Sequence, residues 1–172
     1  MNNPELLISM TTYYIAGAFM MFVMLVILNH FHRRAYLLTW ALSWAGLLAG
    51  YLMLYYSYVF EMDVLFWFYG FFTLLGVFLH QRGVYMFLDR PYPENRLIVF
   101  AGMLVGYGVL ALLMPESILG TLAFFLFSGI LYLDAGHVLL RTRERPYRIY
   151  GAILVTYAVF ITLFPHMTSL LT

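Results

Sequence analysis

The chain contains no cysteine. This absence excludes disulfide bonds, thiolate metal sites and cysteine nucleophiles, and it leaves the redox compartment undetermined. Lysine is missing as well, so that all nine basic residues are arginines. No HExxH zinc motif, GxSxG nucleophile elbow or glycine-rich phosphate loop occurs either. We therefore expect no enzyme activity from the chain alone and no nucleic-acid partner.

Charged residues of any kind are scarce. They make up 10% of the chain, against roughly 25% in a soluble globular domain, while 64% of the residues are hydrophobic. A bilayer removes the need for a polar surface, because lipid tails solvate apolar side chains. Six spans of about 20 residues with short loops would use about 150 residues, so we expect a single transmembrane domain over residues 1–172.

Apolar runs between polar breaks predict six membrane spans. Helices are favoured over barrel strands because the runs are apolar on all sides and do not alternate between apolar and polar residues. The fold class expected is an all-α integral membrane protein with a six-helix transmembrane bundle. The predicted spans are residues 10–31, 35–58, 64–88, 96–114, 118–140 and 148–164.

The arginines indicate the orientation of the bundle. They lie at or near the connections that follow the first, third and fifth spans, whereas the opposite loops carry Glu61, Asp63 and Glu116 and no basic residue. The positive-inside rule then places the arginine-rich turns in the cytoplasm and both termini outside. The amino end has no basic stretch typical of a signal peptide, so we expect the first helix to be retained. The expected location is the inner (cytoplasmic) membrane of a bacterium.

The arginine-rich turns resemble one another. Arg34-Ala35-Tyr36, Arg90-Pro91-Tyr92 and Arg145-Pro146-Tyr147 recur at intervals of 56 and 55 residues. The simplest explanation is three tandem helical hairpins of about 55 residues each. Proline after arginine is expected in the first turn of the returning helix or just before it.

Small residues at helical spacing predict close helix contacts. Gly102 and Gly106 form a GxxxG motif in the fourth span, and Gly46 and Gly50 are spaced in the same way in the second. Such residues let helix backbones approach one another in lipid. Packing within the chain is the favoured interpretation, and homodimerisation is the alternative.

Several polar residues are predicted at one depth near the cytoplasmic side of the membrane. Asp134 is expected about 9 Å inside the span, with His137 one turn away on the same face. An ionised aspartate at that depth costs about 2.5–3.5 kcal/mol, so it needs a partner. Arg82 is the preferred candidate because its charge is opposite and its depth similar, and His80 and His137 come next.

Three interpretations of these polar residues remain open. They can be purely structural, with Arg82 extending to the headgroups. They can form a ligand-binding or switch site of Arg82, Asp134, His80 and His137 for a lipophilic small ligand, a lipid or a proton. Alternatively, His80 with His137 or His30 can ligate haem, although these histidines lie near one edge of the spans. We expect no other cofactor and no other metal.

Residues 29–44, with their basic turn followed by tyrosine and a Trp-Ala-Leu-x-Trp stripe, carry a family resemblance. They are similar to the multi-spanning amino-terminal regions of bacterial diguanylate cyclases (GGDEF proteins) and of some membrane sensor histidine kinases. The hairpin with Arg90-Pro91-Tyr92 looks similar too. The resemblance implies a sensory input module that acts on a cytoplasmic output domain or partner protein. A seventh helix would be needed to return the chain to the cytoplasm, so the sequence fits either a fragment or a free-standing relative.

The function expected first is therefore a membrane-integral sensory or ligand-binding input module of a bacterial signalling protein, non-catalytic by itself. A haem-binding electron-transfer or haem-sensing membrane protein is the second hypothesis. A small membrane enzyme or transporter for a lipophilic substrate is the third.

Overall fold

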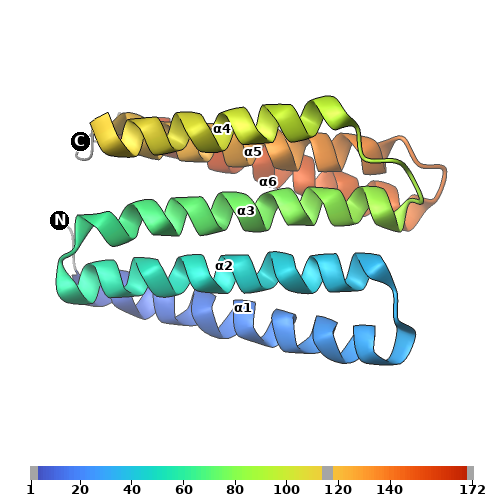
Figure 1. Cartoon of the computed structure of the whole chain (residues 1–172), viewed down its shortest axis with the longest axis horizontal. Helices are drawn as coiled ribbons and strands as arrows, with labels where there is room; N and C mark the ends of the chain where they lie inside the picture. The colour runs from blue at the N-terminus through green and yellow to red at the C-terminus, as the bar shows by residue number, and fades with distance from the viewer. Residues whose placement is uncertain (1–3, 114–117, 170–172) are drawn as a thin grey trace. The chain divides into compact units, whose positions relative to one another are not determined.

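The computed structural model describes the backbone of residues 4–113 and 118–169, and the side chains of residues 7–113 and 119–163. Six α-helices make up this described part of the chain (Figure 1). They are α1 (Pro4–His32), α2 (Ala35–Phe60), α3 (Asp63–Phe87), α4 (Glu94–Leu113), α5 (Ile118–Leu140) and α6 (Arg145–Ser169). All six are long and apolar enough to cross a membrane. The predicted all-helical fold is confirmed, with six helices that could each span a membrane, and these helices suggest a multi-pass membrane protein.

The observed helices are longer than most of the predicted spans. Even the shortest, α4 with 20 residues, covers about 30 Å, the thickness of a hydrocarbon core. α4 begins at Glu94 instead of Arg96, and α6 begins at Arg145 instead of Arg148. The reason is that helical hydrogen bonding continues into polar residues that hydropathy assigns to the loops. The predicted end of the fourth span at Met114 and the loop acid Glu116 lie outside the described residues.

Three helices end on a residue with a left-handed backbone. Arg33, Glu61 and Asp89 follow α1, α2 and the end of α3, with φ of 47°, 53° and 52°. This conformation closes the last helical turn, and at α2 the amide of Met62 donates to the Ser57 carbonyl oxygen at 3.2 Å. Glycine is the usual residue there because it has no Cβ to clash. This chain uses larger residues, at a cost in backbone strain.

The chain divides into two compact units between Gly83 and Val84, inside α3. The first unit contains α1, α2 and most of α3. The second contains the last turn of α3 and then α4, α5 and α6. The division therefore does not follow the boundaries of the three expected hairpins. Nothing tests the single-domain interpretation, which stays a prediction.

Helix α2 packs against both of its neighbours in the first unit. On the α1 side, Leu25 joins Leu37 and Ala41 of α2 in a buried apolar cluster bordered by Trp40 and Trp44. On the α3 side there is almost no room between the backbones: a Cβ at Gly46 would lie 3.2 Å from the Gly76 Cα. Close to that approach, the hydroxyl of Ser43 donates to the Gly76 carbonyl oxygen at 2.8 Å. The predicted packing role of the α2 glycines within the chain is confirmed.

Helix α5 is the central helix of the second unit, with α4 and α6 packed beside it. α5 and α6 approach most closely where Gly136 faces Gly151, since a Cβ on either would lie 2.8 Å from the carbonyl oxygen of the other. The GxxxG motif of α4 behaves differently. A Cβ at Gly102 or Gly106 would meet no atom within 4 Å. The close contact predicted for these two glycines is therefore not seen among the described residues of the second unit.

Candidate functional site

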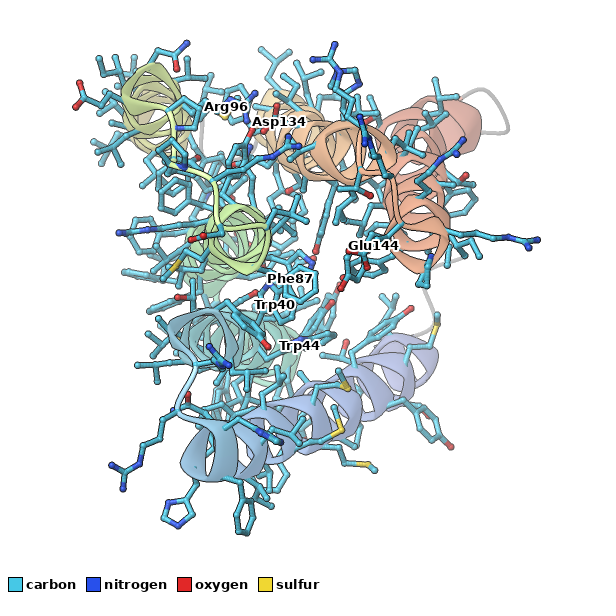
Figure 2. The ribbon with its side chains drawn as sticks, turned by 90° about the vertical axis from the view of Figure 1, so that its right-hand side faces the viewer. Trp40, Trp44, Phe87, Arg96, Asp134 and Glu144 are labelled. Atoms are coloured by element: carbon cyan, nitrogen blue, oxygen red, sulfur yellow. The ribbon has the colours of Figure 1, made fainter. Side chains whose placement is uncertain are left out.

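An ion pair joins α4 to α5 in the second unit. The guanidinium of Arg96 contacts the Asp134 carboxylate oxygen Oδ2 (Figure 2). The hydroxyl of Tyr85, in the last turn of α3, donates to the same oxygen at 3.3 Å. The Arg96 guanidinium also lies over the Tyr85 ring, 4.9 Å from its centre. We call Tyr85, Arg96 and Asp134 the Asp134 cluster.

The turn between α3 and α4 determines where two members of this cluster lie. α3 ends at Phe87, one turn after Val84, so Tyr85 is in its final turn. Pro91 and Pro93 then keep the chain out of a helix until Glu94. The amide of Arg96 donates to the Pro93 carbonyl oxygen at 3.1 Å, which places Arg96 in the first turn of α4. The end of α3 and the start of α4 thus both reach Asp134 on α5.

The electrostatics of the cluster explain how an aspartate is accommodated inside an apolar helix. The side chains of Arg96 and Asp134 are 29% and 22% exposed, so the pair is partly but not wholly removed from solvent. The carboxylate receives one charge-assisted hydrogen bond and one from a phenol, while the arginine gains the face of an aromatic ring. Removing one partner would leave a poorly solvated charge, which costs more than the intact pair contributes.

Tyr92 supports the cluster from the turn between α3 and α4. Its ring meets the Tyr85 ring edge to face, with centres 5.2 Å apart and an interplanar angle of 80°. This contact restricts the orientation of the Tyr85 ring, because edge-to-face packing is the preferred geometry for aromatic pairs. Tyr85 is itself almost fully buried. The phenol that bonds to Asp134 is therefore held on two sides.

The expected partner of Asp134, Arg82, is not the one observed. Arg82 is exposed and belongs to the first unit, whereas Arg96 pairs with Asp134 within the second. The sequence pointed to Arg82 instead of Arg96 because depth along a helix does not specify which face a side chain occupies. It also placed Arg96 at the very edge of a span, although α4 already begins at Glu94.

The histidines named from the sequence lie in different surroundings. The ring of His80 on α3 stacks on Trp40 of α2, with centres 6.0 Å apart, and the Trp40 indole N–H donates to the His80 carbonyl oxygen at 3.3 Å. His30 is exposed and meets Phe31 edge to face. His137 is exposed on α5, one turn beyond Asp134. Among the described residues, no group of three or more His, Cys, Asp or Glu residues is arranged to hold a metal ion.

The sequence did not single out Tyr85 or Arg96 as partners of Asp134. One available signal was Pro93, since a helix commonly begins just after proline and Arg96 then falls in its first turn. Tyr85 gave no comparable signal among so many tyrosines. Comparisons with models of known protein families, with curated proteins and with solved structures gave no match to this chain.

Proposed function

We propose that this chain is a membrane-integral sensory or ligand-binding input module of a bacterial signalling protein, with no catalytic activity of its own. The observation that carries the proposal is the Asp134 cluster, in which an ion pair joins α4 to α5 and the Tyr85 hydroxyl adds the end of α3, in a chain of predominantly apolar helices. Intramembrane ionisable residues are costly and commonly mark functional sites. The resemblance of residues 29–44 to bacterial input regions points the same way.

The cluster has the properties required of a switch. Arg96 and Asp134 are both partly exposed, so a proton, a lipophilic ligand with a polar group or a change in the lipid can compete for either partner. Separating the pair would free the start of α4 from α5. The end of α3 would be affected too, because the Tyr85 hydroxyl donates to the same Asp134 carboxylate. A stimulus that binds the separated state better would shift the population toward it. The shift would pass to a cytoplasmic output domain or partner protein.

The membrane arrangement is part of this proposal. We propose that the helices form three tandem hairpins, with the arginine-rich turns in the cytoplasm and both termini outside, in the inner membrane of a bacterium. The support is the charge distribution, since Glu61 and Asp63 lie where α2 connects to α3, and no basic residue occurs there. The Asp134 cluster would then lie in the cytoplasmic leaflet.

The signalling role can be tested with Asp134→Asn and a matched Asp89→Asn control. Asp89 is exposed in the turn after α3, and asparagine tolerates its left-handed backbone as aspartate does. In the bacterial host, cellular cyclic di-GMP and the genome-wide transcript profile would be compared among wild type, both variants and a deletion strain at equal protein levels. We expect Asp134→Asn, but not Asp89→Asn, to change the output. A deletion without effect would contradict the signalling role, and an unchanged Asp134→Asn strain would contradict the switch.

The orientation can be tested separately because the chain contains no cysteine. Single cysteines at Met62→Cys, in the turn after α2, and Glu144→Cys, in the turn after α5, replace exposed side chains. A membrane-impermeant maleimide applied to intact spheroplasts is expected to label the first variant and not the second. Labelling of the Glu144→Cys variant in sealed spheroplasts would reverse the proposed orientation.

A further inference from the structure

The turn between α5 and α6 concentrates positive charge in a small region. Four arginines and a single acid occur within eight residues, and all five side chains are exposed. We call this segment, residues 141–148, the arginine turn. Its charged residues are Arg141, Arg143, Glu144, Arg145 and Arg148. Among the described residues, no ion pair joins Glu144 to any of these arginines.

The backbone behind the arginine turn is tightly held. Gly136 and Gly151 bring α5 and α6 into near backbone contact just inside the turn. The hydroxyl of Thr142 donates to the Leu139 carbonyl oxygen at 2.8 Å, which closes the end of α5. On the other side, the amide of Arg148 donates to the Glu144 carbonyl oxygen at 3.2 Å. The four exposed cationic side chains therefore emerge from a short connection between closely packed helix ends.

An aromatic contact fixes the first turn of α6. The ring of Tyr147 packs edge to face against Phe87 at the end of α3, with centres 5.0 Å apart and an interplanar angle of 83°. Arg145 and Arg148 flank Tyr147 in the sequence and stay exposed. The ring contact therefore leaves both guanidinium groups available to the surroundings of the turn.

The chemistry of the cations matches phosphate. Arginine presents a planar fork of N–H donors that binds phosphate oxygens two at a time, which lysine cannot do. The arginine turn joins two helices long and apolar enough to cross a membrane, so its side chains would lie at the level of the lipid headgroups. The turn after α1 carries two arginines, half as many as the arginine turn.

We propose that the arginine turn is a binding surface for the phosphate groups of anionic phospholipid headgroups. Arg143 and Arg145, on either side of Glu144, are the central contacts, with Arg141 and Arg148 at the two helix ends. The surface is separate from the Asp134 cluster and does not require the sensory role. Neutral zwitterionic lipids would bind it weakly, because their own ammonium group opposes the arginines.

The test uses the purified full chain in a neutral detergent, titrated with phosphatidylglycerol or phosphatidylcholine, with native mass spectrometry counting bound lipids. Arg143→Gln/Arg145→Gln is compared with Arg33→Gln/Arg34→Gln, which removes the same charge from the exposed turn after α1. Each basic residue near an anionic surface strengthens binding about fivefold. We expect the affinity for phosphatidylglycerol to fall about tenfold or more in Arg143→Gln/Arg145→Gln. In the Arg33→Gln/Arg34→Gln control, the logarithm of the affinity should fall by less than half as much.

Two further variants keep the test decisive if the first one folds poorly. Arg141→Gln/Arg148→Gln should weaken phosphatidylglycerol binding in the same direction, while Arg143→Lys/Arg145→Lys keeps the charge and should give an intermediate loss. Circular dichroism should report unchanged helix content, since the substituted side chains are exposed. Wild-type phosphatidylglycerol binding in both glutamine variants of the arginine turn, or an equal loss in the control at Arg33 and Arg34, would overturn the proposal.

Discussion

The Arg96 guanidinium on α4 contacts the Asp134 carboxylate on α5, and this is the ion pair found in the described part of the chain. The two residues come from predominantly apolar helices that pack less extensively than α5 and α6 do. A charged contact can therefore matter more for this helix pair than surface ion pairs usually do, because little apolar packing replaces it when it is lost.

Tyr85 contributes to the cluster in two separable ways. Tyr85→Phe removes the hydroxyl that donates to Asp134 at 3.3 Å but keeps the ring beneath Arg96. Hydrogen bonds between membrane helices average about 0.6 kcal/mol, so we expect a loss of stability below about 1 kcal/mol. Tyr85→Leu also removes the aromatic face and underfills a buried site, and should cost about 1–3 kcal/mol more. Thermal unfolding in detergent measures the stability of both variants. Equal losses in Tyr85→Phe and Tyr85→Leu would show that the Tyr85 ring is unimportant.

The close approach of α5 and α6 predicts an unusual sensitivity to a single methyl group. In Gly136→Ala the new Cβ would lie 2.8 Å from the Gly151 carbonyl oxygen and from a Val155 methyl. Backbone cannot move aside as a flexible side chain does, so we expect a loss of about 1–3 kcal/mol. Gly17→Ala is the control, since its Cβ would meet nothing within 4 Å and alanine favours a helix. A Gly136→Ala protein as stable as Gly17→Ala would contradict the observed contact.

The left-handed residue after α2 offers a stabilising substitution. Glu61 has φ 53° and ψ 39°, where a side chain is strained and glycine is not. We expect Glu61→Gly to raise the free energy of unfolding by about 1 kcal/mol. Glu94→Gly makes the same chemical change in the first turn of α4. Because that residue is helical, the substitution should lower the free energy of unfolding. Chemical or thermal denaturation compares them, and a loss at both sites would mean that Glu61 is not strained.

The helices could be predicted from the sequence because their signal is local. A run of about 20 apolar residues has few alternatives in a membrane, and all six runs became helices. The ends were less predictable. Pro146 lies inside the first turn of α6, whereas Pro91 precedes α4, although both follow an arginine. Proline has no N–H to pair, so it fits both in the first turn of a helix and just before it. The Arg-Pro-Tyr motif alone therefore could not distinguish the two positions.

The candidate site was predictable only in part. Asp134 stood out because a carboxylate inside an apolar span needs compensation. Its partner depended on which helices become neighbours and which faces they turn to one another. The depth of a residue along its helix gives neither. The same reason explains why Gly46 and Gly102, both in small-residue motifs, differ so much: α3 packs on the first, whereas a Cβ on the second would meet no atom within 4 Å.

The most direct test of the account is a double-mutant cycle on the ion pair. Arg96→Gln, Asp134→Asn and their double variant would be compared by free energy of unfolding in one detergent. Arg82→Gln, alone and combined with Asp134→Asn, is the matched arginine control. We predict that the losses at Arg96 and Asp134 are non-additive by about 1 kcal/mol or more, while Arg82 and Asp134 add within about 0.5 kcal/mol. Additive losses at Arg96 and Asp134, or coupling at Arg82 instead, would contradict the pairing on which the proposed switch rests.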